Sequence, residues 1–136
     1  MTESGSNNLA KKLTGIDWLI ALTASLTTAV VGALLLLNSW ATCDVGINNG
    51  LNTAGLIVFY LPLIAATSFI AWATILRFTA GSETGPRLGG IAAAIFVSLL
   101  LIWFLFSWRH NPGGHYPAPV CPPDNVPSWW PAWIPV

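Results

Sequence analysis

Residues 16–39 read IDWLIALTASLTTAVVGALLLLNS, and this stretch decides the fold class. It carries one charge, Asp17, at its start. Trp18 follows that charge, and Trp40 comes directly after the stretch. A helix rising about 1.5 Å per residue from Trp18 to Trp40 would be roughly 33 Å long. That length matches a bilayer hydrocarbon core of about 30 Å. The stretch therefore predicts a transmembrane helix.

Two further stretches, residues 53–76 and 88–106, are long, apolar and free of Asp, Glu, Lys, Arg and His. The chain as a whole agrees, because 7% of its 136 residues are charged, against about 25% in a typical soluble domain. We therefore predict an all-α membrane protein with three transmembrane helices in a small bundle. The expected organisation is an N-terminal segment at 1–13, a three-helix domain at 14–108, and an irregular tail rich in proline and tryptophan at 109–136.

The first span could instead be a signal peptide. Its apolar run is longer than a usual signal-peptide core, and no clean cleavage site made of small residues follows it before Trp40. We therefore expect a retained helix.

The basic residues predict the orientation. Lys11 and Lys12 precede the first span, and Arg77 and Arg87 lie between the second and third spans. The other side of the membrane has only Arg109. Cytoplasmic segments are enriched in Lys and Arg. The N-terminus and the 77–87 loop are thus expected in the cytoplasm, and the 40–52 loop and the tail outside. We expect a multi-pass plasma-membrane protein, with a layout typical of small bacterial inner-membrane proteins.

Tryptophans near the ends of the spans suggest aromatic belts, since indole rings favour the headgroup level. The residues concerned are Trp18, Trp40, Trp72, Trp103 and Trp108.

The sequence TGID, residues 14–17, opens the first span. Thr14 followed three residues later by Asp17 is a capping-box pattern, and the carboxylate suits the positive end of the helix dipole. Lys11 and Lys12 are close enough in sequence to pair with Asp17. A proton or ion role is the alternative, and the structural interpretation is favoured.

Small residues recur every four positions in two of the spans, and such spacing lets helix backbones approach closely. The sets are Ala21, Ser25 and Ala29 in the first span, and Gly90, Ala94 and Ser98 in the third. We predict that the two sets pack against each other within the chain. Their use in an oligomer is the alternative.

Other features inside the spans also have structural interpretations. Pro62 predicts a kink that frees carbonyl groups near Val58. Thr23, Thr27 and Thr28 could line a polar path, but such hydroxyls usually bond back to a carbonyl one turn earlier.

The two cysteines form the most informative pair. The expected orientation places Cys43 and Cys121 outside, where oxidation is normal. A disulfide would draw the tail back over the outer face of the bundle and contribute about 4 kcal/mol in the chain-entropy model. Free thiols, a metal site or lipidation of Cys43 are the alternatives.

The tail holds eight of the ten prolines and both histidines. His110, His115 and Cys121 could in principle ligate copper or zinc, but their spacing matches no standard metal signature. HNPGGH, residues 110–115, is typical of a turn-rich loop, so we expect no metal there.

Three tryptophans end the tail, in a segment too short to span a bilayer and too rich in proline to be a helix. We predict that Trp129, Trp130 and Trp133 are anchors. They would bury themselves in the headgroups, on their own bundle or on a partner.

No catalytic motif is present, so we expect no enzymatic activity and no cofactor. The net charge of zero provides no field for nucleic acid. The favoured function is that of an accessory or structural subunit of a plasma-membrane complex, with membrane lipid and membrane-protein subunits as partners and homo-oligomerisation open. A small oligomeric transporter or channel for a neutral substrate is the alternative. An exterior metal-handling or redox protein ranks lower.

Overall fold

A computed structural model describes residues 12–46, 50–112, 120–121 and 123–136. Over these residues the fold is all-helical, as predicted, and it contains no strand. Helix α1 spans Gly15–Cys43. A second rod consists of α2 (Gly50–Gly55), η1 (Leu56–Tyr60) and α3 (Leu61–Thr79), and α4 spans Thr84–Arg109. All three rods are long and apolar enough to cross a membrane, so the protein is a multi-pass membrane protein.

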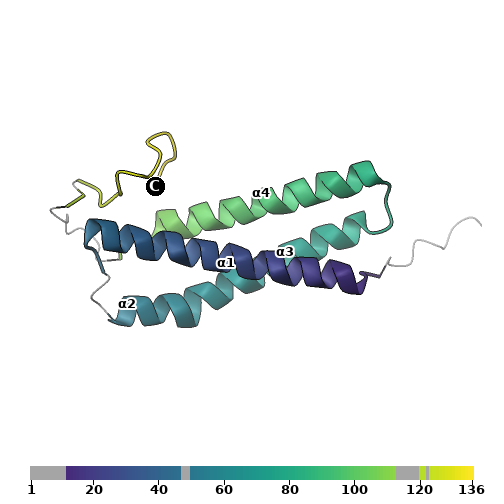
Figure 1. Ribbon diagram of the computed structural model, residues 1–136, viewed down its shortest axis with the longest axis horizontal. Coiled ribbons are helices and arrows are strands. Elements are labelled where there is room, and N and C mark those ends of the chain that lie inside the picture. Colours follow the sequence, from purple (N-terminus) through teal and green to yellow (C-terminus); the bar gives the residue numbers. More distant parts are fainter. Residues whose placement is uncertain (1–11, 47–49, 113–119, 122) are drawn as a thin grey trace, which may run out of the picture.

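The three rods form one elongated bundle, and α1, α3 and α4 each contact the other two. Figure 1 shows the C-terminal tail folded back beside the last turns of α4. We call the end of the bundle where α1 and α4 both finish the tail end. The opposite end, where both helices start, is called the Asp17 end.

The start of α1 is fixed by the predicted capping box. The backbone N–H of Asp17 donates to the Thr14 hydroxyl at 3.3 Å, and the Asp17 carboxylate accepts from the Thr14 backbone N–H at 2.9 Å. The helix ends at Cys43, and the next residue, Asp44, has a left-handed φ of 54° that stops further α-helical hydrogen bonding. Asp is one of the residues that adopt this conformation at low cost.

Pro62 is accommodated by a π-helical turn rather than within a regular α-helix. Proline has no backbone N–H to offer the Val58 carbonyl. Just before it, η1 widens the helix, and the N–H of Leu61 donates to the carbonyl of Leu56, five residues back. The disturbance expected near Val58 is therefore present as a π-bulge, a type of feature that often marks functional sites.

The small-residue sets are buried, but two members have a different neighbour from the one expected. A Cβ atom added to Gly90 would lie 2.7 Å from Cγ2 of Thr79, which belongs to α3. The Ser98 hydroxyl accepts a hydrogen bond from the indole of Trp72, also on α3, at 2.9 Å. Helix α4 thus uses these two small residues against α3. Ala21 and Ala94 do share one buried cluster, which also contains Trp72.

The expected aromatic belts are only partly present. Trp18, Trp103 and Trp108 lie exposed on the surface of the bundle. Trp40 and Trp72 are only 1% and 6% exposed, so both belong to the core. Each buried indole donates its N–H inside the protein, as a buried tryptophan requires. The belt interpretation is wrong for these two residues, because a position near the end of a span does not reveal which way its side chain points.

Candidate functional site at the tail end of the bundle

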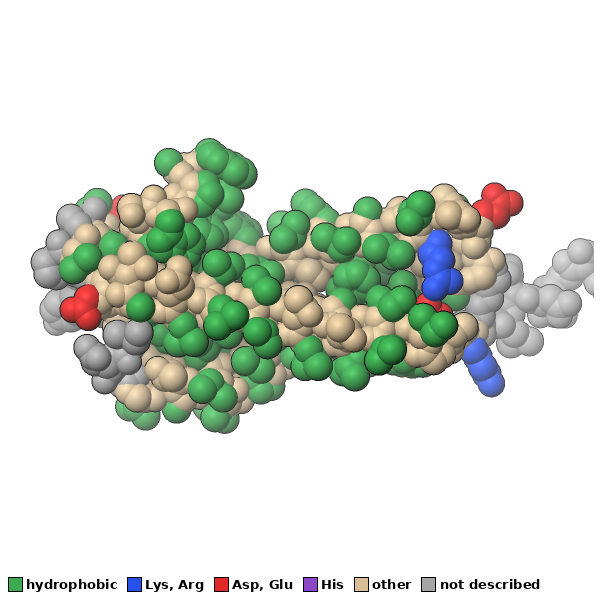
Figure 2. Space-filling view, in the orientation of Figure 1, with side chains coloured by type: hydrophobic (Ala, Val, Ile, Leu, Met, Phe, Trp, Pro, Cys, Tyr) green, Lys and Arg blue, Asp and Glu red, His purple; other side chains and the backbone are tan. Residues whose placement is uncertain are grey.

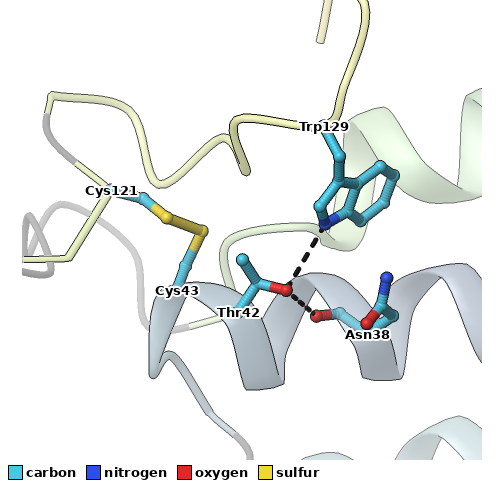
Figure 3. Close-up of a disulfide and its surroundings, with 5 residues drawn as sticks. All are labelled: Asn38, Thr42, Cys43, Cys121 and Trp129. Carbon is cyan, nitrogen blue, oxygen red and sulfur yellow. Dashed lines mark hydrogen bonds between the residues drawn. A yellow bond between two sulfur atoms is a disulfide. The ribbon is translucent and has the colours of Figure 1, made fainter.

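The tail is joined to α1 by the predicted disulfide. Cys43 is the last residue of α1 and is fully buried, and its Cα atom lies 5.2 Å from that of Cys121. Figure 3 shows the bridge leaving the end of the helix towards the tail. Because the bond links positions 78 residues apart, it closes the last part of the chain onto the first helix. The two cysteines are therefore disulfide-bonded, and the alternatives of free thiols, a metal site and lipidation of Cys43 do not apply.

One turn of α1 next to the bridge also receives a tryptophan of the tail. The Trp129 indole N–H donates to the Thr42 hydroxyl at 3.3 Å, and that hydroxyl donates to the Asn38 carbonyl at 2.7 Å. Figure 3 shows both hydrogen bonds meeting at the Thr42 hydroxyl. The Thr42 hydroxyl therefore both donates and accepts, which fixes the position of the Trp129 ring relative to the disulfide.

The most extensive ring contact joins the tail to α4. Trp130 stacks on Phe106 with ring centroids 3.9 Å apart and planes 6° from parallel. Trp129 meets the same phenyl ring edge-on, at 6.0 Å between centroids. Since Phe106 is buried and its partner half-buried, this contact extends the bundle core into the tail.

The tail itself is a series of turns set by its prolines. Its backbone hydrogen bonds run from Asn125 to Cys121, from Trp130 to Pro127 and from Ile134 to Pro131, at 2.8–2.9 Å. Local bonds of this kind satisfy backbone groups without a helix. The irregular tail predicted from the sequence is thus an ordered sequence of turns over the part that the structure describes.

The last residues of the chain return along α4. The Trp103 indole donates to the carbonyl of Pro135 at 2.8 Å. Deeper in the bundle, Trp40 of α1 donates to the carbonyl of Arg109 at 2.9 Å, so the end of α4 is tied to α1 as well. The Arg109 guanidinium lies 5.0 Å from the centre of the Tyr60 ring, a cation–π contact. Both α1 and η1 therefore hold the final turn of α4.

The three predicted anchors have different surroundings. Trp129 and Trp130 pack on the protein's own bundle, through the contacts described above. Trp133 is 82% exposed. Phe106 and Thr42, which receive the tail, were not singled out from the sequence, and Trp103 was expected only in an aromatic belt, because nothing in an apolar span marks the positions that a distant segment will cover.

The structure describes two of the three proposed metal ligands, Cys121 and His110, and each has another contact. Cys121 is bonded to Cys43, and His115 lies outside the described residues. His110 stacks on Phe106, and its Nδ1 atom lies 3.1 Å from the carbonyl oxygen of Ser107. Within the described ranges no cluster of three or more His, Cys, Asp or Glu residues could hold a metal ion.

The opposite end of the bundle is joined by an ion pair. Arg87 of α4 lies 2.6 Å from the carboxylate of Asp17, whose side chain is 3% exposed. The sequence had suggested Lys11 or Lys12 instead. Lys11 lies outside the described residues and Lys12 is exposed. The observed partner comes from a helix 70 residues away, and it links the starts of α1 and α4.

Threonine hydroxyls in the middle of α1 bond back to their own helix. Thr27 and Thr28 donate to the carbonyls of Thr23 and Ala24, one turn earlier, at 2.8 Å. Figure 2 shows charged side chains at the two ends of the visible face and apolar side chains between them.

Comparison of the chain with protein-family models, curated proteins and solved structures finds no match. The tail end, with its fixed aromatic surface, is therefore the best candidate for a functional site, and its chemistry is suited to binding.

Proposed function

We propose that the protein is a non-catalytic accessory or structural subunit of a plasma-membrane complex, and that its tail end docks on a partner membrane protein. The observation that carries this proposal is Trp133, which is 82% exposed on a tail otherwise held by a disulfide and by stacked rings. Exposed tryptophans on ordered segments are typical anchors of protein interfaces.

The fastened tail supports this function through the entropy of binding. A flexible segment loses conformational freedom when it docks, and that loss weakens association. Here the bridge at Cys121 and the turns closed by Pro127 and Pro131 fix the backbone before any partner arrives. A partner would therefore meet an aromatic surface that is already ordered.

Site-specific photo-crosslinking in native membranes tests the proposal. A benzophenone amino acid placed at Trp133 should give one discrete adduct with another membrane protein. The same probe at Trp108, which is also exposed but lies on α4, is the matched control and should give lipid adducts. Adducts at Trp133 with lipid only, or with a second copy of this chain, would contradict the proposed partner.

We also propose that the N-terminus and the 77–87 loop face the cytoplasm, and that the tail end faces outward. The asymmetry of Lys and Arg supports this orientation. After mild reduction, a membrane-impermeant maleimide added to intact cells should label Cys121. Labelling of Cys121 that begins only after lysis would mean the opposite orientation. The control is Ser82→Cys, in the α3–α4 loop, which should be labelled only after lysis.

A further inference from the structure

An apolar groove lies between the C-terminal tail and α4. Its volume is about 600 Å³, within the range of about 300–1,000 Å³ found for small-molecule sites. One wall is α4 and the other is the returning tail. The lining residues are Phe96, Leu99, Leu100, Ile102 and Trp103 on α4, and Trp130, Trp133, Ile134 and Pro135 on the tail.

The polar groups of two lining indoles already have partners within the groove walls. The N–H of Trp103 donates to the Pro135 carbonyl, and the N–H of Trp130 donates to the Ile134 carbonyl at 3.0 Å. These bonds also engage the two carbonyls that accept them. A ligand that needed a hydrogen-bond donor would lose its contacts with water and gain none from these two indoles. The chemistry of the groove thus fits a hydrocarbon occupant.

The position of the groove indicates where that hydrocarbon comes from. Trp103 lies six residues before Arg109, the last residue of α4, which is about 9 Å along the helix axis. Phe96 lies about 20 Å from the same end. Both side chains are exposed on a rod long enough to cross the membrane. The groove is therefore continuous with the lipid-facing surface of α4 and runs from the tail end towards the bilayer centre.

We propose that this groove binds one acyl chain of a membrane phospholipid, taken from the leaflet at the tail end. The chain lies between α4 and the tail, against Leu99 and Leu100 on one side and Trp130 and Trp133 on the other. It differs from the surrounding lipid because the tail covers it. Its methylene groups make van der Waals contacts with the aromatic rings, and these contacts slow its exchange with the bilayer. The proposal concerns the groove walls and does not depend on the partner protein proposed above.

Native mass spectrometry of the full chain with added dipalmitoylphosphatidylcholine tests this site. The protein with its disulfide intact should retain one phospholipid per chain after the detergent is removed. Leu100→Trp fills the groove and should lower that retention about tenfold or more, since a filled site cannot admit the chain. Leu22→Trp is the matched control, because Leu22 has a similar exposure but lies on α1 outside the groove.

A second filling variant, Leu99→Trp, keeps the test decisive if Leu100→Trp does not fold. A cooperative thermal transition in detergent identifies folded protein. The site is supported if a folded filling variant loses the lipid and Leu22→Trp keeps it. Equal retention by all variants would mean surrounding lipid only and would overturn the proposal. Retention of no lipid by the unaltered chain would overturn it as well. A lipid-free dimer of the unaltered chain that Leu99→Trp separates would also overturn it, because the groove would then hold a second copy of the chain.

Discussion

Replacing Gly90 by alanine should destabilise the bundle, and the same change one residue earlier should not. A Cβ atom at Gly90 would meet Thr79 at 2.7 Å from Cγ2, 3.1 Å from Oγ1 and 3.3 Å from Cβ. A Cβ atom at Gly89 would meet nothing within 4 Å. Both glycines lie in α4, so the two variants differ mainly in the contact with α3.

The expected difference follows from two opposing contributions. Alanine favours a helix over glycine by roughly 0.5–1 kcal/mol, and both variants gain this amount. Overpacking a close helix contact costs about 1–3 kcal/mol, and only Gly90→Ala incurs this cost. Thr79 cannot rotate away freely, because its hydroxyl donates to the Ile75 carbonyl at 3.0 Å. Gly90→Ala should therefore be less stable than Gly89→Ala by about 1–3 kcal/mol.

Unfolding in mixed micelles with increasing sodium dodecyl sulfate measures this difference. Thr79→Ser removes Cγ2, the nearest atom, and keeps the hydroxyl that bonds to Ile75. Adding it to Gly90→Ala should therefore restore most of the lost stability. Equal stability of Gly89→Ala and Gly90→Ala would refute the close approach of α3 and α4 at this point. Failure of Thr79→Ser to restore stability would place the clash elsewhere.

Three further perturbations address the ties between the helices and the tail. Cys121→Ser should lower the free energy of unfolding by up to about 4 kcal/mol, seen as a lower thermal midpoint that reductant no longer changes. Arg87→Met leaves the buried Asp17 carboxylate without its cation and should lower the free energy of unfolding in detergent by about 1–3 kcal/mol. This is less than for a fully buried ion pair, because the Arg87 side chain is 39% exposed. Arg77→Met, at an exposed site, should cost nothing measurable. Trp130→Ala should speed proteolysis of the tail by removing the stack, whereas Trp133→Ala should leave the rate unchanged; equal rates would argue against the stack.

The features predictable from the sequence were those with a local or compositional cause. Span lengths follow from apolar runs and bilayer thickness. The capping box follows from the three-residue spacing of Thr14 and Asp17. The disulfide could be predicted because the cysteines are the chain's only two and the basic residues place them on one side.

The features that escaped prediction depend on how distant segments meet. Arg87 and Asp17 are 70 residues apart, and nearer lysines competed for the carboxylate in the sequence. The small residues of two spans are buried as expected, but their pattern does not state which neighbour each face meets, and it gave no sign that Gly90 lies against Thr79 of α3. The groove could not be foreseen at all, because one of its walls is a turn-rich segment whose path depends on Phe106 and Trp103.

The ties at the two ends of the bundle determine how it adapts to membranes of different thickness. The apolar part of α1, from Trp18 to Trp40, is roughly 33 Å long, slightly more than a hydrocarbon core of about 30 Å. A rod that is too long reduces the mismatch by tilting. Because α1 is bonded to α4 through Asp17 at one end and through Trp40 at the other, the two rods tilt together. In a thinner bilayer the whole bundle therefore leans further, and the tail with Trp133 changes its depth and angle at the surface along with it.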